Sequence, residues 1–88
     1  MRALEKRFVY VIHSVSSPDY YYVGLTSDVR QRLEWHNAES GGHTARYRPW
    51  AISVIVEFAD EVRADAFERC LKSGSGRVFT KRHFARSA

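Results

Sequence analysis

Cysteine is nearly absent from this chain of 88 residues, because Cys70 is the only one. A single cysteine excludes an internal disulfide and any zinc site built from several cysteines. Long apolar runs are also absent, and the longest is far shorter than the roughly 20 residues that a membrane-spanning helix needs. The first seven residues carry too much charge for a secretory signal. We therefore expect a cytoplasmic protein that does not associate with membranes.

Hydrophobic residues make up 44% of the chain and aromatic residues 14%. A chain with this much apolar surface can bury enough of it to fold, so disorder is not expected. Its length suits one small domain, and no internal repeat or low-complexity stretch divides it. We expect a single domain over residues 1–88, with its core at residues 7–84.

Basic residues outnumber acidic ones by 14 to 10, and 11 of the 14 are arginine. The planar guanidinium group pairs with phosphate through two parallel hydrogen bonds, which the lysine ammonium group cannot do. The charges are also unevenly placed, because six basic residues and no acidic one follow Glu68. This asymmetry favours a polyanionic partner over a surface that is merely solvated.

Three strands are predicted from the apolar and β-branched residues, at 7–13, 20–25 and 51–58. The turn-forming residues 16–19 separate the first two strands, which we expect to form an antiparallel hairpin. In the third strand, four apolar residues alternate with more polar ones and should share one buried face. They are Ile52, Val54, Val56 and Phe58.

Two helices are predicted, at residues 29–37 and 61–72, with Asp28 and Asp60 as their N-caps. The second helix has an expected apolar stripe. It consists of Val62, Ala66, Phe67, Cys70 and Leu71, which makes Cys70 a small hydrophobic residue of the core.

The remaining segments contain turn-forming residues. Residues 38–49 are interpreted as a long polar loop, and a loop of this length is often functional. Residues 73–76, with the sequence Ser-Gly-Ser-Gly, should stop the second helix, and residues 77–84 should form one or two helical turns. The expected fold class is α+β, with a small antiparallel sheet of about three strands flanked by helices.

Five short blocks in this order resemble the GIY-YIG nuclease family. Phe8-Val9-Tyr10 stands at the first motif, Tyr22-Val23-Gly24 at the second, and residues 28–37 are similar to the family's arginine helix. Residues 44–50 and 66–74 resemble the loop before the third strand and the metal-carboxylate helix. The likeness is to the small stand-alone bacterial members and to the N-terminal domain of excision-repair nucleases.

The resemblance covers about residues 7–84, which is nearly the whole chain. One position departs from the pattern, because Phe8 replaces the glycine of the first motif. Small bacterial members often lack that glycine, so we do not interpret the change as inactivation. The resemblance implies a single GIY-YIG-like nuclease domain over residues 1–88.

The resemblance also implies a catalytic set of Tyr10, Tyr22, Arg32, His36 and Glu68. Hydrolysis of a phosphodiester needs a base, a cation for the phosphate and help for the leaving oxygen, and these side chains suit those tasks. An unperturbed tyrosine has a pKa of about 10 and needs a nearby metal or arginine to act as a base. Glu68 would hold one hard divalent cation, Mg²⁺ or Mn²⁺. Which tyrosine is the base stays open, although we favour Tyr22.

Each of these side chains also has an ordinary interpretation. Tyrosines in strands usually pack, and a helical arginine such as Arg32 is usually solvated. Glu68 has Lys72 four residues further on and could simply form an ion pair with it. His36 could be a hydrogen-bonded residue at the edge of the core, or it could orient a tyrosine or relay a proton.

Basic residues expected to contact phosphates occur in the loop and near the C-terminus. They are Arg46, Arg48, Lys72, Lys81 and Arg82. Contacts of this kind position a strand without reading its sequence. Three aromatic residues could stack on unpaired bases or simply pack. They are Trp35, Tyr47 and Trp50.

The expected function is metal-dependent endonucleolytic cleavage of DNA in repair or processing. Sequence specificity should be low, with single-stranded or branched DNA as the expected substrate and RNA left open. The protein is expected to act as a monomer or weak homodimer, or with a protein partner. Two alternatives are a catalytically inactive nucleic-acid-binding module and a protein-interaction subunit that uses exposed Trp35 and Trp50.

Overall fold

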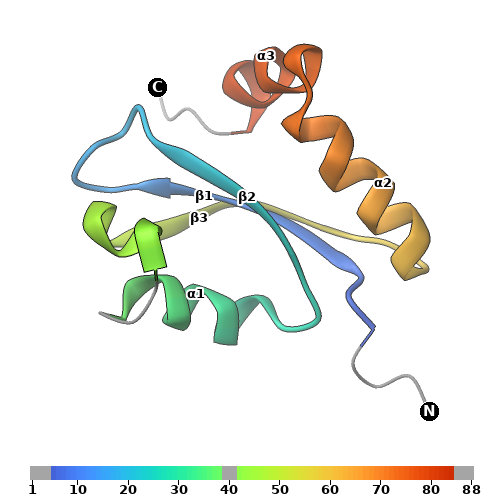
Figure 1. Ribbon diagram of the computed structural model, residues 1–88, viewed down its shortest axis with the longest axis horizontal. Coiled ribbons are helices and arrows are strands. Elements are labelled where there is room, and N and C mark those ends of the chain that lie inside the picture. The colour runs from blue at the N-terminus through green and yellow to red at the C-terminus, as the bar shows by residue number, and fades with distance from the viewer. Residues whose placement is uncertain (1–4, 39–41, 85–88) are drawn as a thin grey trace.

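The computed structural model describes residues 5–38 and 42–84, and it shows a small sheet between two groups of helices (Figure 1). In chain order the elements are β1 (Phe8–Ser14), β2 (Tyr21–Thr26), α1 (Val29–Asn37), the 3₁₀ helix η1 (Gly42–Tyr47), β3 (Trp50–Glu57), α2 (Glu61–Lys72) and α3 (Gly74–His83). None of the helices in the described part of the chain is long and apolar enough to cross a membrane.

The three strands form one antiparallel sheet in the order β2-β1-β3. The predicted α+β class and the hairpin are therefore confirmed. The predicted strands deviate from the observed ones by one residue, and the predicted bounds of α1 and α2 are those of the structure. Because β1 lies in the middle, β2 is an edge strand, and this position matters for the site.

Both faces of the sheet are covered (Figure 1). On one face Val9 and Val11 pack with residues of α2, and the helix α3 continues from α2 on that side. On the other face Tyr10 and Ile12 pack against residues of α1 and against Trp50. Successive residues of a strand point to opposite faces, so a central strand covered on both sides is apolar throughout.

A β-bulge in β3 overturns the prediction that Ile52 and Val54 share a face. Val11 pairs with Val54 but Ile12 pairs with Ile52, so Ser53 is an extra residue in β3. A bulge shifts the alternation by one residue. Ile52 therefore packs in the cluster of Tyr10, whereas Val54 packs on the opposite face. The Ser53 hydroxyl forms a 2.7 Å hydrogen bond with Nδ1 of His13 on β1.

The predicted N-caps are both present, because Asp28 accepts from the N–H of Gln31 and Asp60 accepts from the N–H of Arg63. The predicted apolar stripe of α2 is mostly wrong. Ala64 and Leu71 are the buried residues of α2, and Phe67 lies half-buried against Phe58. Positions 64, 67 and 71 follow the helical period, which leaves the neighbouring face exposed. That face carries Val62, Ala66 and Cys70, so Cys70 is not a core residue.

The predicted stop of the second helix is confirmed, because α2 ends at Lys72, but residues 74–76 also begin a further helix. Ser73 ends α2 and also caps α3, because its hydroxyl accepts from the N–H of Gly76 at 3.2 Å. The third helix therefore begins at Gly74 instead of residue 77. A Cβ atom at Gly76 would overlap the Cys70 carbonyl, so only glycine allows α3 to start this close to α2. The predicted loop at 38–49 is likewise wrong in part, since η1 lies within it.

Candidate active site

The ring of Tyr10 crosses the edge strand at Gly24. The two residues are paired in the register of β1 and β2. A Cβ atom at position 24 would overlap the ring and hydroxyl of Tyr10. The missing side chain of Gly24 therefore gives Tyr10 room to lie over β2, and this explains why the second motif ends in glycine.

A buried hydrogen-bond chain holds Tyr10 from α1. The Tyr10 hydroxyl lies 2.9 Å from Nε2 of His36, and Nδ1 of His36 lies 2.9 Å from the Thr44 hydroxyl. The exposed fractions of Tyr10 and His36 are only 2% and 1%. When the imidazole proton is on Nδ1, Tyr10 donates to His36 and His36 donates to Thr44. His36 is thus an edge-of-core histidine whose hydrogen bonds fix the orientation of Tyr10.

The surroundings of Tyr10 favour its neutral form. Burial raises the pKa of Tyr10 well above the ordinary value of 10, and the neighbouring Tyr22 and Glu68 raise it further, while Arg32 lowers it. Desolvation disfavours the charged phenolate. Tyr10 is therefore protonated at neutral pH. The same interactions place three other predicted site residues within electrostatic reach of its hydroxyl.

Tyr22 lies beside this pair at the edge of the sheet. Its ring centroid is 4.9 Å from that of His36 and 6.4 Å from that of Tyr10. Tyr22 is half-buried, whereas Tyr10 is fully buried. The Lys72 ammonium lies 5.6 Å from the centre of the Tyr22 ring, which is within the range of a cation–π contact.

Glu68 and Arg32 approach the tyrosines from opposite faces of the sheet. Glu68 is on α2, with a side chain that is 14% exposed and an Oε2 atom 2.6 Å from Nζ of Lys72. The ion pair weighed from the sequence is therefore formed. Arg32 is on α1 and is half-buried, with its guanidinium 5.2 Å from the centre of the Trp35 ring. Among the described residues no carboxylate pairs with Arg32, which leaves this cation available for a phosphate.

The donor set fits a divalent ion that is held only partly by protein. No group of three or more His, Cys, Asp or Glu side chains gathers in the described part of the chain. Mg²⁺ keeps several waters and commonly binds one or two carboxylates together with substrate phosphates. Glu68 can supply that one carboxylate, and water and a substrate phosphate would complete the ligands of the ion.

The expected phosphate-binding residues lie at three places in the fold, on α2, in or just after η1, and in α3. Lys72 directly adjoins the cluster of candidate catalytic residues, through Glu68 and Tyr22. Within the described residues, no ion pair or side-chain hydrogen bond connects the other four to the cluster. They are Arg46 and Arg48 at the end of η1, and Lys81 and Arg82 in the last turn of α3.

The three aromatic residues predicted to stack on bases or to pack differ in how far they are buried in the structure. Trp50 is 5% exposed and its indole N–H donates to the Thr44 carbonyl at 2.8 Å, so it is a packing residue. Tyr47 stacks on Tyr20, with ring centroids 4.2 Å apart. Trp35 is the most exposed of the three, with 41% of its surface accessible.

Two supporting residues were missed by sequence reasoning. Thr44 holds His36, and the side-chain amide of Asn37 bonds both the N–H and the carbonyl of Trp50, at 2.6 and 3.2 Å. These bonds tie the end of α1 to the start of β3. No signal in the sequence distinguishes Thr44 from an ordinary loop threonine, because its role depends on where η1 packs.

Residues 6–82 match the family described as the GIY-YIG catalytic domain. The chain belongs to the GIY-YIG family. It is 36% identical over 67 residues to a structure-specific endonuclease subunit SLX1 of Scheffersomyces stipitis, covering 68% of this chain and 20% of the relative. A protein of the same name from Meyerozyma guilliermondii is 35% identical over 83 residues, covering 88% of this chain and 27% of the relative.

The family expected from the sequence is therefore confirmed. The GIY-YIG domain spans only about a fifth to a quarter of the length of these curated relatives. The relatives are fungal, which weighs weakly against the expected likeness to bacterial members. No solved structure matches this chain.

Proposed function

We propose that this GIY-YIG domain is a metal-dependent endonuclease that hydrolyses phosphodiester bonds in DNA. The observation that carries the proposal is the gathering of Tyr10, Tyr22, His36 and Glu68 around the edge of β2, with Arg32 in electrostatic contact with Tyr10. The printed name of the relatives, structure-specific endonuclease subunit, supports branched DNA as the substrate and DNA repair or processing as the setting. The word subunit also supports a protein partner.

Tyr22 is the better placed of the two tyrosines to activate water. It is half-buried at the sheet edge and can meet solvent, whereas Tyr10 is buried, protonated and bonded to His36. In the proposed reaction the Tyr22 hydroxyl first releases its proton to solvent, and the phenolate that results accepts a proton from a water molecule. The hydroxide formed from that water attacks phosphorus. The bond from phosphorus to the leaving oxygen then breaks, and that oxygen gains a proton from solvent.

The other side chains position and stabilise the phosphate. Arg32 donates to the non-bridging oxygens, where removal of a preorganised donor commonly costs roughly 10²–10³ in rate. Tyr10 and His36 form a rigid support that keeps Tyr22 and the phosphate in place. Glu68 would hold Mg²⁺ or Mn²⁺, and a bound ion would supply a Lewis acid for the phosphate and the leaving oxygen.

A cleavage assay with matched variants tests the proposal. Purified protein is incubated with end-labelled single-stranded, duplex and forked DNA in Mg²⁺, Mn²⁺ or EDTA. The variants Glu68→Gln and Arg32→Gln are compared with Arg63→Gln, which removes an exposed arginine paired only with Asp60. We expect metal-dependent cleavage, strongest on forked DNA, that is lost in the first two variants and kept in Arg63→Gln.

Two results would contradict this function. Intact DNA under every condition, with binding still measurable, would identify an inactive nucleic-acid-binding module. Cleavage that persists in EDTA, or in Glu68→Gln at the parent rate, would remove the proposed metal role of Glu68.

A further inference from the structure

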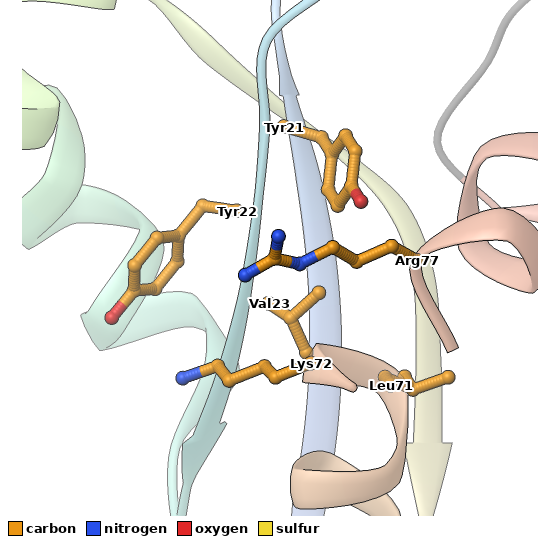
Figure 2. Close-up of a pocket in the computed structure, with 6 residues that line it drawn as sticks. All are labelled: Tyr21, Tyr22, Val23, Leu71, Lys72 and Arg77. Carbon is orange, nitrogen blue, oxygen red and sulfur yellow. The ribbon is translucent and has the colours of Figure 1, made fainter. Parts of the chain in front are cut away.

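A basic pocket opens beside Tyr22, on the α2 and α3 side of the edge strand (Figure 2). Its volume is about 220 Å³, and it is open to solvent on one side. The lining residues are Tyr21, Tyr22, Val23, Leu71, Lys72 and Arg77. Two of these six side chains are cationic, and none is acidic. A pocket of this composition suits an anion.

Arg77 is the side chain that distinguishes this pocket from the rest of the basic surface. It extends from α3 across β2, so that its guanidinium lies between Tyr21 and Tyr22 (Figure 2). No carboxylate in the described part of the chain pairs with it. By contrast, Arg63 and Arg69 on α2 lie 3.7 and 2.7 Å from Asp60 and Asp65. The guanidinium of Arg77 is therefore not neutralised, and its planar fork suits phosphate oxygens.

The alternation of β2 places the pocket next to the proposed catalytic site. The ring of Tyr22 points toward α1, whereas the ring of Tyr21 points toward α3 (Figure 2). Lys72 joins the two places, because it lines the pocket and its Nζ atom also lies 2.6 Å from Glu68. A DNA strand whose reacting phosphate lies at Tyr22 and Glu68 would thus have a neighbouring phosphate near Arg77.

We propose that this pocket binds the phosphate next to the scissile one, through the guanidinium of Arg77 with support from Lys72 and the Tyr21 hydroxyl. The inference rests on the proposed nuclease function and adds a binding residue to it. Arg77 acts here as a contact to the DNA backbone. It therefore sets the register of the strand across Tyr22 without reading sequence.

The test measures binding in EDTA, where a cleavage reaction that needs metal cannot interfere. Forked DNA fixes the register, and in each of a series of forks one phosphate is replaced by an uncharged methylphosphonate. The parent protein is compared with Arg77→Gln, Arg77→Lys and the control Arg63→Gln by fluorescence anisotropy. Thermal unfolding followed by circular dichroism checks that each variant is folded.

Several methylphosphonate positions should weaken parent binding, because Arg32 and other cations are also proposed to contact phosphates. The position adjacent to the cleavage position should weaken it by about fivefold, through loss of the contact with Arg77. Arg77→Gln should bind unmodified DNA about as weakly as the parent binds the fork with that methylphosphonate. The same methylphosphonate should not weaken the binding of Arg77→Gln any further. Arg77→Lys should recover part of the loss, because it keeps the charge but not the fork.

The inference is overturned if folded Arg77→Gln binds no more weakly than Arg63→Gln, or if a methylphosphonate next to the cleavage position weakens its binding as much as it weakens that of the parent. These outcomes are separate from failure of the nuclease proposal. Binding that depends on Arg77 without cleavage would reject catalysis alone, whereas metal-dependent cleavage without a role for Arg77 would reject the pocket alone.

Discussion

Tyr10 and Thr44 both form hydrogen bonds with the ring of His36, which is only 1% exposed, and this makes Thr44 more important than its type suggests. The hydrogen bond between the Thr44 hydroxyl and Nδ1 of His36 holds the imidazole ring in one orientation. In that orientation Nε2 of His36 faces the Tyr10 hydroxyl. Thr80 is as buried as Thr44, but its hydroxyl has no partner among the described residues. The two threonines therefore form a matched pair in the same protein.

We predict that Thr44→Val lowers the free energy of unfolding by about 1–3 kcal/mol, because it leaves a buried ring nitrogen without its partner. The cleavage rate should fall too, since Tyr10 loses its support. Thr80→Val should be neutral or stabilising, because it removes an unpaired buried hydroxyl. Urea unfolding and initial cleavage rates measure both effects. Equal losses in the two variants would contradict the role of Thr44.

The raised pKa of Tyr10 predicts a pH dependence of stability. Because the folded-state pKa lies above the unfolded value of about 10, the contribution of Tyr10 is fully present below pH 10. This stabilising contribution is lost as the pH rises from 10 toward the folded-state pKa. In that range the unfolded chain binds fewer protons than the folded protein, so the free energy of unfolding falls. Tyrosinate absorbance should therefore show a late ionisation that accompanies unfolding, distinct from that of the exposed Tyr20, whose pKa is raised chiefly by its side-chain hydrogen bond with Tyr47.

Tyr10→Phe provides the check on this assignment. The variant should lack the late step, and its stability should depend less on pH above 10. A late step of the same size in Tyr10→Phe would assign the raised pKa to another tyrosine.

At the scale of elements, the pairing of β1 with β2 depends on one missing side chain. Gly24 lies under the Tyr10 ring, and a methyl group there would force the ring or the edge strand to move. Gly74 is a useful comparison, because a Cβ atom there would meet nothing within 4 Å.

Gly24→Ala should therefore destabilise the fold by about 1–3 kcal/mol through overpacking, and should lower cleavage further by displacing Tyr10. Gly74→Ala should keep the cleavage rate and leave stability unchanged or slightly higher, since alanine favours helix. Urea unfolding midpoints and cleavage rates of the two variants decide this. Parent-like cleavage in Gly24→Ala would show that the position of Tyr10 is not critical.

At the scale of the whole molecule, the sheet has helices on both faces and a free edge at β2. Arg32 and His36 reach that edge from α1, and Glu68 and Lys72 reach it from α2. Besides Lys72, the expected phosphate contacts lie in or just after η1 and in the last turn of α3. DNA binding should therefore depend on charge over both sides of the proposed site.

We predict that Arg46→Gln weakens binding to DNA of any sequence and lowers the slope of log affinity against log salt by about 0.7–0.9. Arg46 is exposed and lies next to Tyr47, so its loss should not affect the core. Anisotropy titrations between about 50 and 200 mM salt measure the slope. If Arg63→Gln changed the slope equally, the effect would reflect net charge instead of a contact.

The elements of this fold were predicted well where local pattern decides them. The spacing of apolar residues and the caps Asp28 and Asp60 fixed the bounds of α1 and α2, since side-chain caps act within one turn. The β-bulge at Ser53 and the start of α3 at Gly74 could not be predicted from local pattern. A bulge depends on pairing with β1, and Gly76 has its role only because α2 lies against it.

The sequence by itself determined the family and predicted a candidate set of catalytic side chains, because a family is recognised from residue types and their order along the chain. Only the tertiary structure decided that Tyr10 is buried against His36, that Tyr22 meets solvent, and that Glu68 pairs with Lys72. It alone brought Arg77 beside Tyr22. The physical reason is that burial, pKa and ion pairing depend on neighbouring side chains. Many of these neighbours are distant in the sequence and come close only when the chain folds.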